Sequence, residues 1–265
     1  TKAFNLIAAV TLMRGKRGSK VTLTIARQGV KNVFDVSVVR RIIKVPSVIY
    51  KLYDGGIGYV SISSFQLGTA RAFERALKKL SEEGNIRGLV LDLRKNPGGL
   101  LDQSVEICDA LLDHGVIVTT ENRGKEIDRR EAHGEGNEPT YPIVVLVDGG
   151  SASASEIVAG ALQDNKRATI MGTTSFGKGT VQTVVDLDDG SGLKLTIARY
   201  LTPSGRVIQG TGIKPDVVVP AKKSKEGSEK SAEEEVSENV KKEPAKPKED
   251  YQLDQAIEYL KNLTK

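Results

Sequence analysis

The 265-residue sequence contains one cysteine, two histidines and no tryptophan. A single cysteine, Cys108, cannot form a disulfide within the chain, so a disulfide scaffold and a zinc ribbon are both excluded. Cys108 falls in an apolar helical pattern with Val105 and Leu112, and we expect it to lie in the core. We expect neither a metal nor a cofactor.

Long hydrophobic runs are also missing. No apolar stretch approaches the roughly 18 residues of a membrane-spanning helix, and the N-terminus lacks the pattern of a secretory signal. We therefore expect any export signal or membrane anchor to lie upstream of residue 1. Hydrophobic residues make up 38% of the chain and charged residues 28%. This composition is typical of globular proteins and excludes collagen-like, coiled-coil and wholly disordered chains.

Acidic residues are scarce in the first part of the chain. Residues 1–46 hold ten Lys and Arg side chains and one acid, Asp35. A basic module of this kind suits nucleic acid, an anionic membrane surface or an acidic peptide. Because the segment has one aromatic residue, Phe34, and no recognisable groove-reading motif, we expect no nucleic-acid partner.

Residues 1–45 have the pattern of a small, incomplete module. An apolar helical face comes first, followed by a turn at 14–18 and two alternating strands at 21–25 and 33–38. One helix and two strands are too little for a stable core. We therefore expect this segment to be the trailing half of a small domain.

Residues 46–221 alternate between apolar strands and amphipathic helices. Helical stripes occur at residues 70–80, ending near Gly84, and from Ile157 to Leu162. The apolar strands that separate them are expected at 58–62, 88–93, 142–147 and 168–171. This alternation predicts a layered α/β core with a largely parallel sheet. A further strand is expected at 193–200.

The C-terminal part changes composition sharply. Residues 222–250 hold eight Lys and nine acidic residues and no aromatic residue. Such a stretch cannot bury enough apolar surface to offset its chain entropy, so we expect a disordered linker. Within residues 251–265, Leu253, Ile257 and Leu260 predict a short amphipathic helix, which needs a surface to pack against.

The stretch from Tyr141 to Ile157 is the most informative for chemistry. A buried strand runs into a turn of Gly, Ser and Ala and then into a helix, and Ser153 and Glu156 have the spacing of a capping box. One interpretation is that Ser153 only caps the helix. The other is a nucleophile, because a small-residue elbow exposes the hydroxyl beside helix N–H groups that can stabilise an oxyanion.

A serine nucleophile needs a base, and three side chains are candidates. His114 ends a predicted helix and His133 lies in a polar run, and each also fits an ordinary surface histidine. Lys178 can act as a base only where burial favours its neutral form. These three alternatives are left open by the local pattern.

The segment around Lys178 is rich in glycine. We expect Gly177 and Gly179 to let its backbone approach another segment closely, and Phe176 and Val181 to exclude water from the lysine. A phosphate-binding loop is excluded, because Gly179 stands where that motif needs Ser or Thr.

A tight turn follows the strand at 88–93. Pro97 and the paired glycines Gly98 and Gly99 leave N–H groups exposed at the end of a buried strand. These groups suit a second oxyanion donor, although an ordinary strand-ending turn has the same pattern.

In combination, these motifs resemble the carboxy-terminal processing proteases, also called tail-specific proteases, of the S41 serine peptidase family. The resemblance covers most of residues 40–220 and keeps the family's order of motifs. The motifs are GYVSISSF at 58–65, DLRKNPGG at 92–99, GSASASEI at 150–157, FGKGTVQ at 176–182 and GIKPD at 212–216.

The resemblance implies a ClpP/crotonase-like core and a serine endopeptidase that uses a Ser-Lys dyad. The 25-residue separation of Ser153 and Lys178 agrees with the family's spacing and selects Ser153 over the neighbouring serines. The implied roles are nucleophile for Ser153, general base and later acid for Lys178, and orientation of the lysine for Gln182. The implied oxyanion donors are the N–H groups of Ala154 and of the Gly98–Gly99 turn, with Gly99 preferred.

The resemblance also bears on partners and location. It implies that residues 1–45 are the second half of a PDZ domain and that the substrates are proteins or peptides with accessible C-terminal tails. It allows a homo-oligomer, implies an extracytoplasmic location in the periplasm or cell envelope, and leaves membrane association to a segment upstream. Two alternatives are a non-catalytic binding protein on the same fold and a His-dependent hydrolase that uses His114 or His133.

Overall fold

The computed structural model describes residues 5–27, 29–42, 45–134, 136, 138–221 and 250–264. The chain divides into two compact units, one containing residues up to Pro46 and the other containing Ser47–Ser224 and Lys248–Lys265. The predicted disordered linker at 222–250 lies outside the described residues, apart from Asp250.

The first unit consists of a helix and a β-hairpin. Helix α1 (Leu6–Met13) is capped by Asn5, and β1 (Lys20–Ile25) pairs antiparallel with β2 (Phe34–Val39). Arg40 ties them together, since its side chain donates hydrogen bonds to the carbonyl oxygens of Met13, at 2.8 Å, and Lys20, at 2.9 Å. The predicted helix and both strands are confirmed, and the assignment to a PDZ domain stays a prediction.

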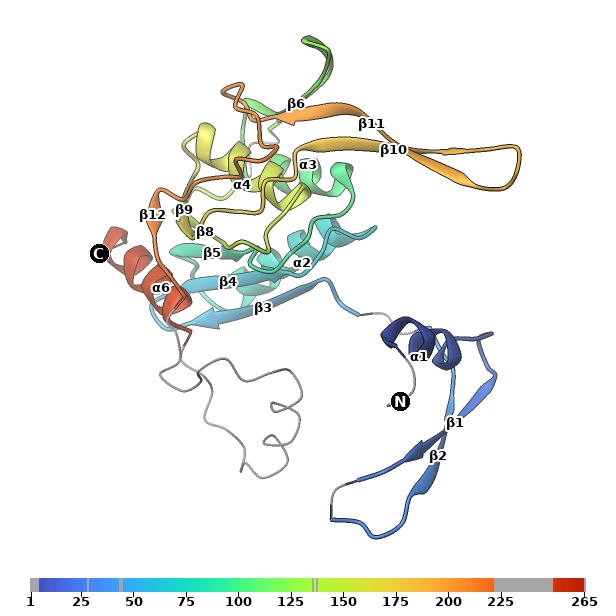
Figure 1. The fold of residues 1–265 in the computed structure, drawn as a ribbon. Helices are drawn as coiled ribbons and strands as arrows, with labels where there is room; N and C mark the ends of the chain where they lie inside the picture. The colour runs from blue at the N-terminus through green and yellow to red at the C-terminus, as the bar shows by residue number, and fades with distance from the viewer. Residues whose placement is uncertain are drawn as a thin grey trace. The chain divides into compact units, whose positions relative to one another are not determined.

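The second unit is built on a six-stranded sheet (Figure 1). Strands β4, β5, β8, β9 and β12 run parallel, and β3 is an antiparallel edge strand. The order across the sheet is β12 (Val217–Val218), β9 (Ala168–Gly172), β8 (Ile143–Val147), β5 (Gly88–Asp92), β4 (Ile57–Ile62) and β3 (Val48–Tyr53). The four apolar strands expected from the sequence are thus confirmed, and they lie side by side.

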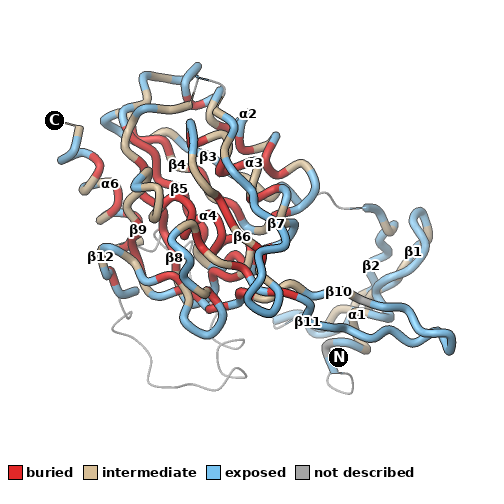
Figure 2. Tube along the Cα trace, turned by 90° about the horizontal axis from the view of Figure 1, so that it is seen from above, coloured by how far each residue is buried: buried red, intermediate tan, exposed pale blue. Residues whose placement is uncertain are grey.

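Helices cover both faces of this sheet, which explains why its four inner strands are largely apolar. Side chains alternate along β5, so that Leu89 and Leu91 pack in a core with α2 (Thr69–Glu83), α3 (Leu101–Asp109) and α4 (Ala154–Asp164). Cys108 lies fully buried in this core, as expected, and burial raises the pKa of its thiol. Figure 2 shows the buried residues concentrated in the central strands and in α4.

The opposite face of the sheet receives the C-terminal helix α6 (Tyr251–Leu263). Its buried residues Leu253, Ala256 and Leu260 pack with Val90 of β5 and with apolar residues of β4, β8 and β9. The amphipathic helix expected within 251–265 is therefore confirmed. It packs as a layer of the second unit and begins 30 positions after Ala221, the last described residue of the preceding segment.

An ionic cluster anchors the start of α6 to the end of β5. Arg94 Nη2 lies 2.6 Å from Asp92 Oδ2 and 2.7 Å from Asp250 Oδ2, and Asp250 is the N-cap of α6. The hydrogen bond from Arg94 is the main reason that the pKa of Asp250 lies below its ordinary value. Because Arg94 precedes the glycine turn at 98–99, the cluster links that turn to the C-terminal helix.

A second, four-stranded antiparallel sheet was predicted only in part. Its order is β10 (Thr180–Asp186), β11 (Gly192–Leu201), β6 (Val116–Asn122) and β7 (Lys125–Glu131). The expected strand at 193–200 is β11, whereas β7 is exposed along its whole length and carries no apolar alternation in its sequence.

Of the helices that the structure describes, none has the length and apolar character needed to cross a membrane.

Candidate active site

Ser153 lies at the junction of β8 and α4, in a conformation that few non-glycine residues adopt. It is the N-cap of α4, with φ 57° and ψ −114°, and such a conformation costs on the order of 1–3 kcal/mol. The predicted capping box forms, and Glu156 Oε2 accepts a hydrogen bond from the Ser153 N–H at 2.8 Å. Helix cap and strained elbow are thus one structure, so the capping role does not exclude a nucleophile.

The three serines of the elbow have different surroundings. Ser151 and Ser155 are fully buried, and their hydroxyls donate to the carbonyl oxygens of Leu93, at 2.8 Å, and Asn96, at 3.0 Å. Ser153 is only partly buried. The outer serines therefore hold the elbow against the neighbouring turn, and Ser153 is the one that a substrate can reach.

The turn after β5 is fixed against this elbow by Asn96, which is fully buried. The Asn96 carbonyl oxygen accepts the Ala152 N–H at 2.9 Å, and its side-chain amide donates to the Ile62 carbonyl at 2.7 Å. A Cβ atom on Gly98 would lie 2.8 Å from the Ser153 Cβ and 3.0 Å from the Ala154 nitrogen. The approach of turn to elbow therefore requires a residue without a Cβ.

Two backbone N–H groups remain available at this contact. Within the described parts of the chain, neither the Gly99 N–H nor the Ala154 N–H donates a hydrogen bond, whereas the Gly98 N–H donates to Asn96 Oδ1 at 2.9 Å. The turn thus offers Gly99 rather than Gly98 as a donor for an external acceptor. Backbone N–H groups without an internal acceptor are the kind of donor that an oxyanion hole uses.

The glycine-rich segment with Lys178 reaches the elbow through Glu156. This fully buried carboxylate accepts the Lys178 N–H at 2.8 Å on the same oxygen, Oε2, that accepts the Ser153 N–H. The close approach expected at the two glycines is confirmed. A Cβ on Gly177 would lie 3.1 Å from the Gly212 nitrogen, and one on Gly179 would lie 2.6 Å from the Gln209 nitrogen.

The expectation that Phe176 and Val181 exclude water from the lysine is wrong. Phe176 is 66% exposed, Val181 packs instead at the edge of the main core, and Lys178 itself is exposed. The physical reason is that only the backbone of Phe176 is held in place: its N–H donates to the Ser151 carbonyl oxygen at 2.9 Å. The ring of Phe176 faces solvent. Nothing in the described residues buries the lysine amine.

Gln182 lies on β10, directly after a bulge in its pairing with β11. Its side chain is exposed, and its Nε2 atom lies 3.4 Å from Thr196 Oγ1 on the neighbouring strand. The segment beyond Lys178 is therefore extended rather than helical, and this contact directs the amide toward β11.

Both histidines lie far from Ser153. His114 and His133 have side chains that are 85% and 83% exposed, beside Asp113 and Asp109. Gly115 lies against Asn165, the C-cap of α4, so this region is at the end of α4 opposite to Ser153. The 11 residues of α4 correspond to about 16 Å. The structure places neither histidine at the elbow.

Two residues that organise the site, Glu156 and Asn96, are not identified as site residues by the sequence analysis. Glu156 was noted only for its capping-box spacing, and Asn96 only as part of the turn. The available signal was their type: a carboxylate and an amide within otherwise small or apolar motifs, where a buried polar side chain needs several hydrogen bonds. What they bind, however, comes from other parts of the chain.

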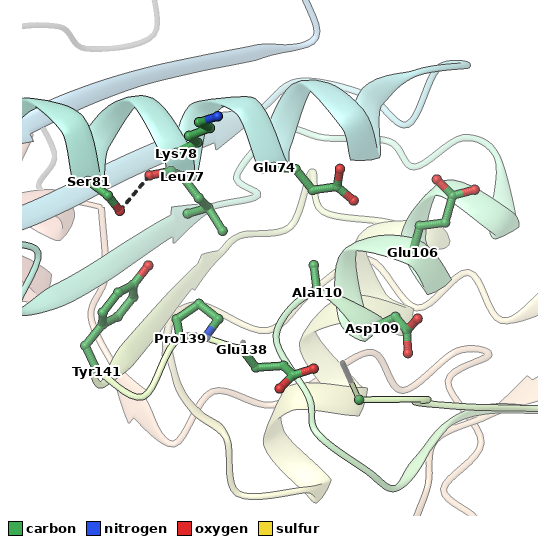
Figure 3. Close-up of a pocket in the computed structure, with 11 residues that line it drawn as sticks. Glu74, Leu77, Lys78, Ser81, Glu106, Asp109, Ala110, Glu138, Pro139 and Tyr141 are labelled. Carbon is green, nitrogen blue, oxygen red and sulfur yellow. Dashed lines mark hydrogen bonds between the residues drawn. The ribbon is translucent and has the colours of Figure 1, made fainter. Parts of the chain in front are cut away.

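Two cavities of the second unit differ in their relation to the predicted site residues. A cavity of about 640 Å³ between α2 and α3 is lined by carboxylates, among them Glu74, Glu106 and Asp109, and by none of the predicted site residues (Figure 3). A second cavity, of about 700 Å³, includes Thr180 and Gln209. Because Gln209 accepts the Gly179 N–H at 3.0 Å, this second cavity adjoins the lysine segment.

A parallel sheet covered on both faces, with a strained serine elbow and two free N–H groups at the strand ends, is an arrangement compatible with a serine hydrolase. The profile of peptidase family S41 matches residues 56–219, and the chain belongs to this family. The family resemblance noted in the sequence is thereby confirmed.

Similar proteins share this assignment. A carboxy-terminal-processing protease of Bartonella bacilliformis is 50% identical over 215 residues, which make up 80% of this chain and 49% of that protein. The carboxy-terminal processing protease CtpA of Bacillus subtilis is 42% identical over 219 residues, covering 82% of this chain and 46% of that protein. The chain thus spans about half the length of these curated relatives.

Solved structures agree with the fold. A photosystem II D1 C-terminal processing protease has a TM-score of 0.63 and 37% sequence identity, covering 78% of this chain and 57% of that one. A putative peptidase from Parabacteroides merdae, at 20% identity and a TM-score of 0.60, supports the fold alone. The α/β fold class expected from the sequence is confirmed.

Proposed function

We propose that this chain carries the catalytic core of a serine endopeptidase that processes proteins at their C-terminal ends. One observation carries the proposal: the accessible Ser153 hydroxyl lies on a strained elbow, against a glycine turn, with the Ala154 and Gly99 N–H groups free beside it. The names of the relatives support the C-terminal processing of protein substrates.

In the proposed mechanism Lys178 takes the proton of Ser153, and Oγ attacks the carbonyl carbon of the scissile peptide. The oxyanion that forms accepts hydrogen bonds from the Gly99 and Ala154 N–H groups. Lys178 then gives the proton to the leaving amine, which leaves an acyl group on Ser153. A water molecule, deprotonated by Lys178, attacks this ester. Lys178 then returns the proton to the leaving Ser153 Oγ, which frees the new C-terminus.

The exposure of Lys178 adds a condition to this mechanism. A lysine accepts a proton only as the neutral amine, and exclusion of water favours that form. Because Lys178 is exposed here, we infer that bound substrate covers it. Gln182 lies on β10, close to Lys178 along the chain. Its side-chain amide is proposed to exchange the contact with Thr196 for a contact with the Lys178 amine, which it then orients.

The remaining features of the proposal concern the whole protein. Residues 1–45 are proposed to belong to a PDZ domain that captures substrate tails, supported by a helix and an antiparallel strand pair in this segment. An extracytoplasmic location and a homo-oligomer stay predictions from the family resemblance.

The decisive experiment is incubation of the chain with an unstructured protein, followed by mass mapping of the cuts. We expect cleavage by the wild type, none by Ser153→Ala, and covalent labelling of Ser153 alone by a fluorophosphonate. Labelling at another serine, or cleavage that survives Ser153→Ala, would contradict the assignment. An unlabelled wild type would favour a binding protein.

A further inference from the structure

The Glu156 carboxylate makes four hydrogen bonds, and all four go to the two segments of the proposed dyad. Oε2 accepts the N–H groups of Ser153 and Lys178, each at 2.8 Å. Oε1 accepts the Gly177 N–H at 2.7 Å and the Ser175 hydroxyl at 2.5 Å. Glu156 is itself fully buried. Since an ionised carboxylate is purely an acceptor, four donors satisfy it as the anion.

From this geometry we infer that Glu156 is a positioning residue of the active site, which sets the distance between the nucleophile and the base. The inference rests on the proposed function, because it concerns the same Ser153 and Lys178. One oxygen atom holds both backbone nitrogens, so the two nitrogens lie within twice 2.8 Å of each other. The two segments are separated by β9, and this carboxylate fixes their register at the elbow.

The network extends to a third segment of the chain. The Ser175 hydroxyl that donates to Glu156 also accepts the Ile213 N–H at 2.7 Å, and the Ser175 N–H donates to the Ile213 carbonyl at 3.1 Å. The GIKPD motif at 212–216 is thereby tied to the carboxylate through Ser175. Two of the five motifs of the sequence thus meet at the Glu156 side chain, and a third is joined to it through Ser175.

A helix cap alone does not require this arrangement. The capping function needs only the bond between the Glu156 side chain and the Ser153 N–H. The other three bonds stabilise no part of α4, since their donors belong to residues 175–178. Hydrogen bonds to an ionised group are shorter and stronger than neutral ones, so four of them on one buried carboxylate suit the placement of a loop.

Substitution by glutamine distinguishes the two roles. Glutamine has nearly the same shape but offers one acceptor oxygen and an N–H₂ group that donates. In one orientation the amide nitrogen faces the Ser153 and Lys178 N–H groups, and in the other it faces the Gly177 N–H. Either way at least one donor of the lysine segment loses its acceptor, and the segment must shift away from Ser153.

A matched carboxylate lies at the other end of the same helix. Asp164, the last residue of α4, accepts the Ser204 N–H at 2.9 Å and the Ser204 hydroxyl at 2.7 Å, and its side chain is 9% exposed. Asp164 also pairs with Arg206, and Ser204 is exposed whereas Ser175 is buried. Asp164→Asn and Ser204→Ala therefore make the same chemical changes without touching the dyad, and their stability is measured beside that of Glu156→Gln and Ser175→Ala.

The test makes three measurements on these four variants, Ser153→Ala and the wild type. They are the steady-state kinetics (kcat and KM) on a short unstructured peptide, the rate of fluorophosphonate labelling of Ser153 by intact mass, and stability in urea. We expect Glu156→Gln to lower kcat and the labelling rate together by about 10²-fold, because a misplacement near 1 Å costs that much. KM should stay within about twofold. Ser175→Ala should show a smaller loss of the same kind, and the Asp164 and Ser204 variants none.

The outcomes separate the inference from the proposed function. A folded Glu156→Gln variant with wild-type kcat and labelling overturns the positioning role. The same conclusion follows if Asp164→Asn, at equal loss of stability, loses as much activity. If Glu156→Gln does not fold, the inference is tested by comparing the activity of Ser175→Ala with that of Ser204→Ala. Equal activity of these two variants overturns the inference. Cleavage that survives Ser153→Ala instead overturns the proposed function.

Discussion

Gly98 lies so close to Ser153 that a Cβ atom on Gly98 would come within 2.8 Å of the Ser153 Cβ. Its φ of 98° is also unfavourable for any other residue. The turn and the elbow are therefore positioned by a contact that only glycine permits, and the free N–H groups of the site depend on this contact.

The first prediction is that Gly98→Ala abolishes peptide cleavage, because the added methyl pushes the turn, with its Gly99 N–H, away from the elbow. Losing one oxyanion donor costs about 10²–10³-fold in kcat. The control is Gly68→Ala, which has φ 86° but nothing within 4 Å of the added methyl. It should lose about 1–2 kcal/mol of stability from backbone strain and keep its activity. Equal activity in both variants would contradict the prediction.

The second prediction separates the three serines of the elbow. Ser153→Ala should abolish turnover at a cost of about 1 kcal/mol in stability, the usual value of a helix cap. Ser151→Ala should keep the nucleophile but lose about 1–3 kcal/mol, because the half-buried Asp148 N–H loses its acceptor and the Leu93 carbonyl keeps only the Asn96 N–H as a donor. Urea denaturation and peptide turnover of both variants check this. Turnover by Ser153→Ala is the result that would count against it.

The third prediction concerns the packing of α6. Leu260 is fully buried on the sheet, whereas Leu263 on the same helix is 57% exposed. Leu260→Ala should reduce the free energy of unfolding by about 2–5 kcal/mol, and Leu263→Ala should change it by less than about 0.5 kcal/mol. Denaturation in urea measures both. Similar small effects would mean that α6 does not contribute to the core.

The fourth prediction is a pH dependence at the start of α6. The pKa of Asp250 is lowered in the folded state, mainly by its hydrogen bond from Arg94. A lowered folded pKa means that Asp250 stabilises the fold above its unfolded pKa of about 3.9, and that this contribution disappears as the pH falls through the folded value. Because Asp250 is partly exposed, the contribution should be about 1 kcal/mol or less.

The measurement compares wild type and Asp250→Asn in urea at neutral pH and near pH 3. The variant should be less stable at neutral pH, and the difference should shrink in acid. Glu258→Gln, at an exposed position of α6, is the control and should show no such trend. A difference that grows in acid would reverse the assigned sign.

The sequence alone determined four of the six strands of the main sheet and the position of the elbow. Strands β4, β5, β8 and β9 are covered on both faces and are therefore largely apolar, and a short local window records that environment. The glycines at 98, 99 and 177 were likewise recognisable, because close backbone approach leaves a local signature in residue type. The order of the motifs was sufficient to indicate the S41 family, which the family profile confirms.

Tertiary structure decided what those local patterns do not contain. Strand β7 is exposed throughout and exists because β6 supplies its hydrogen-bond partners, so no apolar alternation marks it. The exposure of Phe176 could not be inferred from its type, because an aromatic ring is buried only where other segments cover it. Glu156 looked like a helix cap from its spacing, yet three of its four donors lie about 20 residues away. A buried carboxylate is satisfied by whichever segments the fold brings to it, and only the folded chain shows which these are.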